Sequence, residues 1–90
     1  MNQINEKLRK SCEDAIVAFQ KLGNDKYSDI QSNLTWCIGS YAYDKNPVGL
    51  HEYGTKSLDL LKKIKTKEPR KVNKKVIDNL QKAIQVYGKN

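Results

Sequence analysis

Long apolar runs are absent from this sequence, and no stretch approaches the ~20 residues that a helix needs to cross a bilayer. The opening residues, MNQINEKLRKSCED, lack the apolar segment of a secretory signal, so we expect a protein that acts in the cytoplasm. Only two cysteines occur, too few for a disulfide framework. The 90 residues have room for one core, so we expect a single domain over residues 1–90.

Residues suited to catalysis are equally scarce. One histidine and two cysteines cannot complete a tetrahedral zinc site without another ligand, so we expect no metal and no cofactor. His51 and Glu52 are neighbours on a predicted helix and point about 100° apart, which excludes a preformed acid–base pair. We expect His51 at the surface near a helix start. The sequence has no glycine-rich phosphate loop and no nucleophile beside a base, so we predict no catalytic residues and no enzyme.

The two cysteines, Cys12 and Cys37, lie on apolar stripes about a dozen residues either side of the first predicted turn. We expect two reduced, buried thiols that face one another. Packed helices are 8–10 Å apart whereas a disulfide needs Cα atoms within ~7 Å, so a bond between them is not expected.

A helical period is the dominant pattern that the sequence does contain. Apolar side chains recur at spacings of three and four residues, which predicts helices over about residues 3–22, 26–43, 47–66 and 73–87. Gly23 ends the first of these, Asn46 and Pro47 begin the third, and Asn73 caps the fourth. The expected i,i+4 pairs are Glu6–Lys10, Glu52–Lys56, Asp59–Lys63 and Asp78–Lys82.

The connections between these helices are short, which forces neighbouring helices to run antiparallel. We therefore predict an all-α protein, an antiparallel up-down four-helix bundle. The alternative is a three-helix core with a loosely attached first or last helix.

The net charge of +7 comes from one segment, residues 62–75, which reads KKIKTKEPRKVNKK. We call it the basic segment. The predicted topology brings it to the same end as Lys21 and Lys26. One interpretation is a solvated face that promotes solubility. The other is a site for phosphates or nucleic acid, formed by Lys62, Lys63, Arg70, Lys71, Lys74 and Lys75. Cations in the first turn of the fourth helix are unfavourable unless an anion is bound there. A single arginine and no aromatic residue weaken the nucleic-acid interpretation.

A row of aromatic and small residues lies on the second predicted helix, away from its apolar stripe. It consists of Trp36, Gly39, Ser40 and Tyr43, at i, i+3, i+4 and i+7, followed by Asp44. We call these five residues the aromatic stripe. Exposed aromatic side chains anchor protein interfaces, so the stripe is a candidate protein-binding surface, together with the corner at residues 43–49. The alternative is that Trp36 is buried against the next helix at Gly54.

The size, basic balance and four-helix layout are similar to those of small bacteriocin immunity proteins, a resemblance of architecture that assigns no residue a role. We expect a small, non-catalytic, protein-binding or accessory module that contacts a protein partner, or a second copy of itself, through the aromatic stripe. The second hypothesis is an anion- or nucleic-acid-binding protein that uses the basic segment.

Overall fold

The computed structural model describes residues 3–23 and 25–88, and these residues form four α-helices and no strand. The helices are α1 (Gln3–Lys21), α2 (Ser28–Asp44), α3 (Val48–Lys67) and α4 (Lys74–Gly88), and a 3₁₀ turn, η1 (Asp25–Tyr27), precedes α2. The prediction of an all-α four-helix bundle is confirmed. The predicted helix ends are wrong by at most two residues, the largest error being the start of α2, where the first turn is 3₁₀.

Local signals explain where the helices end. Gly23 has φ +60° and donates its N–H to the Gln20 carbonyl at 3.0 Å, the left-handed ending that glycine adopts without strain. The Asn46 side chain accepts the Val48 N–H at 3.1 Å, which caps α3 around Pro47. The Asn73 side chain does the same for the N–H of Lys75 in α4 at 2.8 Å.

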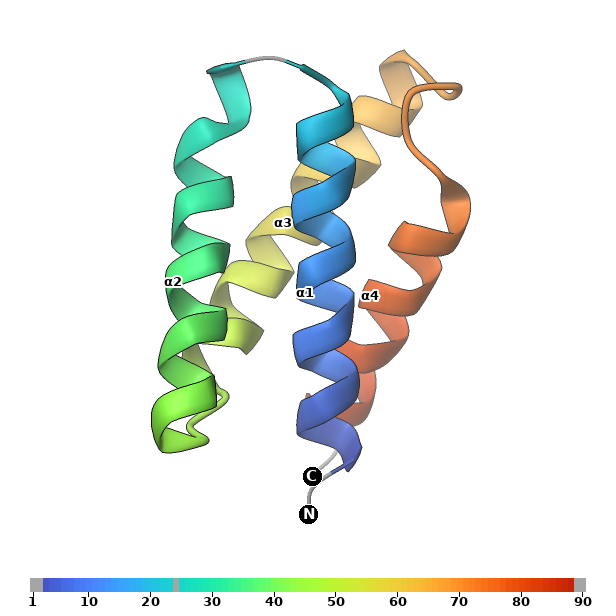
Figure 1. Ribbon diagram of the computed structural model, residues 1–90. Helices are drawn as coiled ribbons and strands as arrows, with labels where there is room; N and C mark the ends of the chain where they lie inside the picture. Colours follow the sequence, from blue (N-terminus) through green and yellow to red (C-terminus); the bar gives the residue numbers. More distant parts are fainter. Residues whose placement is uncertain (1–2, 24, 89–90) are drawn as a thin grey trace.

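The four helices pack around one core, and α1 contacts each of the other three. In Figure 1, α3 runs obliquely behind α1 instead of lying strictly alongside α2. Leu8 and Phe19 of α1 and Leu80 of α4 are completely buried, so the first and last helices are integral to the bundle. The alternative with a loosely attached terminal helix is therefore wrong.

The α1–α2 and α3–α4 connections lie at the same end of the bundle, as the up-down topology predicts (Figure 1). The basic segment thus shares an end with Lys21 and Lys26. Among the described residues, none of the helices combines the length and the apolar character that a bilayer crossing requires.

Candidate binding surfaces

The aromatic stripe lies on the outside of α2 with both of its rings in solvent. Trp36 exposes 72% of its surface and Tyr43 93%. Gly39 and Asp44 are exposed as well, and Ser40 is half-buried. A Cβ atom at Gly39 would meet no atom within 4 Å, so no neighbouring element packs against this point of the stripe. The stripe therefore faces solvent and not the core.

The alternative expectation, that Trp36 packs against Gly54, is wrong. Gly54 is buried between α1 and α4, where an added Cβ would lie 3.4 Å from the Cys12 sulfur and 3.7 Å from Leu8 and Leu80. Figure 1 shows α3 crossing obliquely behind α1, and the atoms nearest to a Cβ at Gly54 belong to α1 and α4. The close approach that glycine permits is thus made with a thiol and two leucines.

The middle of α2 carries no charge, and its charged residues, Asp29 and Asp44, lie at its two ends. No lysine, arginine, aspartate or glutamate occurs in residues 30–43, although 30% of the chain is charged. Beside Trp36, α1 and α2 enclose an open hollow of about 460 Å³. Its lining is uncharged throughout: Ile16, Gln20, Ser28, Gln31, Ser32, Thr35 and Trp36. This hollow was not predicted from the sequence. The uncharged run in α2 is the one feature of the sequence that could have indicated it.

The corner after α2 is held by local hydrogen bonds. Lys45 ends the helix with φ +60°, and its N–H donates to the Tyr41 carbonyl at 2.7 Å. The Asp44 carboxylate accepts the Asn46 N–H at 2.9 Å. Val48 follows with 59% of its surface exposed, which adds an apolar side chain at the start of α3. The corner is thus a fixed turn that ends on an exposed valine.

The residues predicted to bind anions are all exposed: Lys62, Lys63, Arg70, Lys71, Lys74 and Lys75. Lys71 pairs with Glu68, the only acid of the basic segment, at 3.3 Å. The other five have no ion-pair partner in the part of the chain that the structure describes. The Asn73 cap already occupies one N–H of the first turn of α4, which leaves fewer backbone donors for an anion.

One lysine of the basic segment has a structural role. The Lys65 ammonium donates to the carbonyls of Pro69 and Val72, both at 3.0 Å, and so closes the α3–α4 connection over the end of α3. Val72 itself is buried. Lys65 is therefore not available to an anion in the way that its exposed neighbours are.

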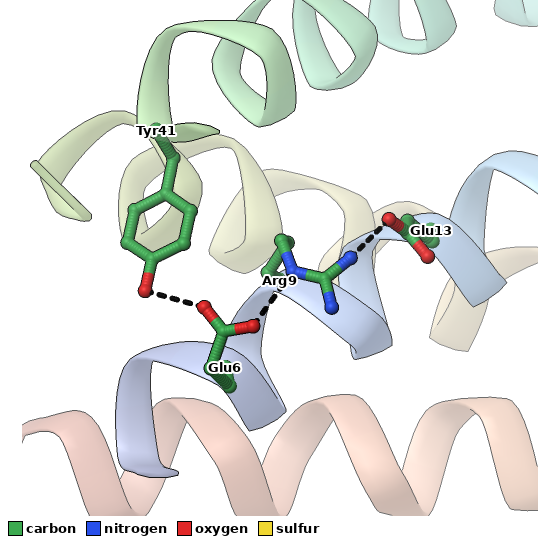
Figure 2. Close-up of polar contacts among 4 residues, drawn as sticks. All are labelled: Glu6, Arg9, Glu13 and Tyr41. Carbon is green, nitrogen blue, oxygen red and sulfur yellow. Dashed lines mark hydrogen bonds and ion pairs between the residues drawn. The ribbon is translucent and has the colours of Figure 1, made fainter. Parts of the chain in front are cut away.

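A polar cluster that the sequence analysis missed joins α1 to α2 (Figure 2). The Tyr41 hydroxyl donates to the Glu6 carboxylate at 2.7 Å, Arg9 donates to Glu6 at 3.2 Å, and Arg9 also pairs with Glu13. The hydrogen bond from Tyr41 is the main reason that the pKa of Glu6 is lowered. The same bond raises the pKa of Tyr41. The predicted Glu6–Lys10 pair is wrong, because Glu6 turns toward α2.

Of the other three predicted i,i+4 pairs, one is within ion-pair distance and two are not. Glu52 and Lys56 lie 3.9 Å apart, within ion-pair distance. Asp59–Lys63 and Asp78–Lys82, both within the described residues, make no such contact.

The two thiols are free and buried, as predicted. Burial, with smaller contributions from the charges of Cys37 and Glu13, raises the pKa of Cys12 to about 12. Burial also raises the pKa of Cys37. The Cys12 S–H points to the Leu50 carbonyl at 3.6 Å. A protonated thiol is a poor nucleophile, so these raised pKa values lower the reactivity of both thiols at neutral pH.

His51 differs from the surface position that the sequence predicts. It is half-buried and stacks on Tyr87 of α4, with ring centroids 4.6 Å apart. The stack joins the start of α3 to the end of α4. Among the described residues, no group of three or more histidine, cysteine, aspartate or glutamate side chains could hold a metal ion.

Comparison with protein-family models, with curated proteins and with solved structures finds no match to this chain.

Proposed function

We propose that this protein is a non-catalytic module that binds a protein partner through the aromatic stripe. The observation that carries this proposal is the exposed indole of Trp36 within residues 30–43, a run of α2 that has no charged residue. The centres of protein interfaces are enriched in aromatic residues and depleted of charged ones, whereas ordinary solvent-facing helix surfaces are rich in charge.

The hollow beside Trp36 supplies the second half of the contact. An indole that protrudes from a surface inserts into a partner, and a hollow next to it accepts a side chain in return. Amide and hydroxyl groups from Gln31 and Thr35 line the hollow, so the partner residue that enters it is uncharged. Tyr43 and Val48 extend the contact toward the corner at residues 43–49. We expect the module to act in the cytoplasm, because Cys12 and Cys37 are free thiols.

Site-specific photocrosslinking tests this proposal. A benzophenone amino acid replaces Tyr43 in one variant and Asp59 in a control variant, and the full chain is produced in cells of its own source. Asp59 is exposed on α3, away from the stripe. We expect a discrete crosslinked adduct from position 43, loss of that adduct when Trp36→Ala is added, and none from position 59.

The mass of the adduct identifies the occupant. An adduct twice the mass of the chain means that the partner is a second copy, which sedimentation of the purified protein checks independently. The proposal is refuted if position 43 gives no more adduct than position 59, or if the adduct is indifferent to Trp36→Ala.

A second candidate function is anion binding by the basic segment, and it is favoured by one observation. Five exposed cations, which have no ion-pair partner within residues 3–23 and 25–88, gather at the end of the bundle that also holds the exposed Lys21 and Lys26. Clustered unpaired cations attract polyanions such as nucleic acid.

Binding of labelled duplex DNA and single-stranded RNA at ~50 and ~200 mM salt tests this function, since each phosphate contact adds about 0.9 to the logarithmic salt slope on duplex DNA. The variant is Lys71, Lys74, Lys75→Glu, and a control with the same net charge is Lys10, Lys56, Lys82→Glu. We expect binding that weakens with salt and disappears only in the first variant. Equal loss in both variants, or no binding at low salt, rejects the site.

A further inference from the structure

The charged residues of α1 differ in whether they have partners. Glu6, Arg9 and Glu13 are engaged with one another, and the Tyr41 hydroxyl donates to Glu6 (Figure 2). Lys7 and Lys10 line a groove between α1 and α4, and both also border a shallow hollow with Glu6 and Arg9. Glu6, the acid predicted to neutralise Lys10, forms no ion pair with it among the described residues.

The groove between α1 and α4 has a volume of about 300 Å³, near the lower bound of small-molecule sites, which run from about 300 to 1,000 Å³. Its lining comes from both helices: Ile4, Lys7, Lys10, Ser11, Asp14, Asn79, Lys82, Ala83 and Val86. The Ser11 hydroxyl donates to the Asn79 carbonyl at 3.4 Å, which ties the two walls together. Ser11 and Ala83 are buried and form the floor.

The groove is apolar at one end and cationic along its rims. Ile4 begins α1 and Val86 ends α4, so in this antiparallel pair their apolar side chains meet at the same end of the groove. Lys7 and Lys82 stand on opposite walls next to that end. Neither has an ion-pair partner among the described residues, nor does Lys10.

Asp14 is the only acid among the described residues that line the groove. It lies ten residues, or about 15 Å along the helix axis, from Ile4, so its charge belongs to the far end of the groove. The part of the groove near Lys7 and Lys82 therefore has an uncompensated positive charge beside an apolar surface.

We propose that this groove binds a small anionic amphiphile, with a carboxylate or phosphate head between Lys7 and Lys82 and a short hydrocarbon tail over Ile4, Ala83 and Val86. The charge complementarity selects an anion, and the apolar end selects one with a tail over a bare inorganic ion. The volume of about 300 Å³ is within the range of small-molecule sites, which favours a small ligand.

Titration of the ¹⁵N-labelled full chain tests the site, with amide shifts of Ser11, Ala83 and Val86 as the readout. The probes are octanoate and octyl phosphate, with octylammonium, butyrate and inorganic phosphate as controls. We expect saturable shifts at these residues for the two long anions, at least about tenfold weaker binding of the tail-less anions, and no saturable shift with octylammonium.

Two variants with the same charge change locate the site. Lys7, Lys10, Lys82→Gln should weaken octanoate about tenfold, since each exposed ion pair contributes modestly. Lys62, Lys63, Lys67→Gln should leave the affinity unchanged. Equal binding of octylammonium, equal loss in both variants, or binding of an acidic amphipathic peptide in place of octanoate would overturn the proposal. Unchanged amide spectra outside the groove show that each variant is folded.

Discussion

The buried thiol of Cys12 should make this protein less stable as the pH becomes alkaline. Cys12 is completely buried, and a Cβ atom added at Gly54 would lie 3.4 Å from its sulfur. Burial raises the pKa of this thiol to about 12, whereas an exposed cysteine titrates near 8.5. Above pH 8.5 the unfolded chain therefore loses a proton that the folded protein keeps.

The sign and size of the effect follow from proton linkage. A pKa that is raised in the folded state gives stability that is fully present below the unfolded pKa and is lost as pH rises toward the folded pKa. Each pH unit between about 9 and 12 removes about 1.4 kcal/mol. From pH 9 to 11 the loss is about 3 kcal/mol, a large share of the 5–15 kcal/mol typical of a domain.

Urea unfolding at pH 8, 9, 10 and 11, with a reductant present, compares the wild type with Cys12→Ala. At pH 8 the variant should be less stable by about 1–2 kcal/mol, because the sulfur fills core volume. The difference should shrink by about 1.4 kcal/mol per pH unit above 9 and then change sign. The raised pKa of Tyr41 acts in both proteins and cancels in the difference, whereas the charge of Cys37 interacts with Cys12 and belongs to the measured effect. Parallel pH profiles would refute the reasoning.

Three further changes probe the backbone and the connections, each measured by thermal or urea unfolding. Gly39→Ala should raise stability by about 0.5–1 kcal/mol, because helix α2 gains alanine where a Cβ meets open space; a loss would mean an unseen contact. Lys45→Gly should be more stable than Lys45→Ala by about 1 kcal/mol, because both lose the ammonium and only alanine keeps the strain of φ +60°; equal stability would contradict this. Lys65→Met should lower stability by about 1–2 kcal/mol through two lost carbonyl bonds, whereas Lys62→Met should be nearly neutral; equal effects would remove the structural role of Lys65.

The helices were predictable because local chemistry fixes them. The apolar period defined the buried side of each helix, and Gly23, Asn46 and Asn73 set boundaries through hydrogen bonds that involve only near neighbours. The end of α2 was less predictable, because Lys45 takes the left-handed conformation without being a glycine. Its ring contact with Tyr41, 5.4 Å from ammonium to centroid, is a feature that no sequence spacing signals.

Whether Trp36 is buried or exposed depends on the angle at which α3 crosses the other helices, and the sequence does not specify that angle. Counting helical levels from the α2–α3 corner places Gly54 opposite Trp36 only if the helices lie side by side. The oblique crossing directs Gly54 to Cys12 and Leu80, so Trp36 stays exposed. Both outcomes fit the same apolar period, because the period determines which side of a helix is buried and not the angle at which two helices cross.

The same limit explains the polar cluster at Tyr41. Spacing along α1 favoured a Glu6–Lys10 pair, worth a few tenths of a kcal/mol on an exposed helix. A buried tyrosine on α2 offers Glu6 a short hydrogen bond that a lysine four residues away does not match. Helix spacing therefore assigned the Glu6 carboxylate to the wrong partner, because its actual partner is 35 residues away in the sequence. As a result, spacing also predicted an ion pair for Lys10, which lines the α1–α4 groove without one among the described residues.

The net charge of +7 bears on which occupant the aromatic stripe accepts. Two copies that meet through α2 bring like charges together, and this repulsion opposes association at low salt although Asp44 is the one charged residue of the stripe. A partner with an acidic rim around an uncharged centre gains attraction where a second copy loses it. Added salt therefore strengthens a homodimer and weakens a complex with an acidic partner. Because α2 itself adds only the acids Asp29 and Asp44 to this face, the direction of the salt dependence distinguishes an acidic partner from a second copy.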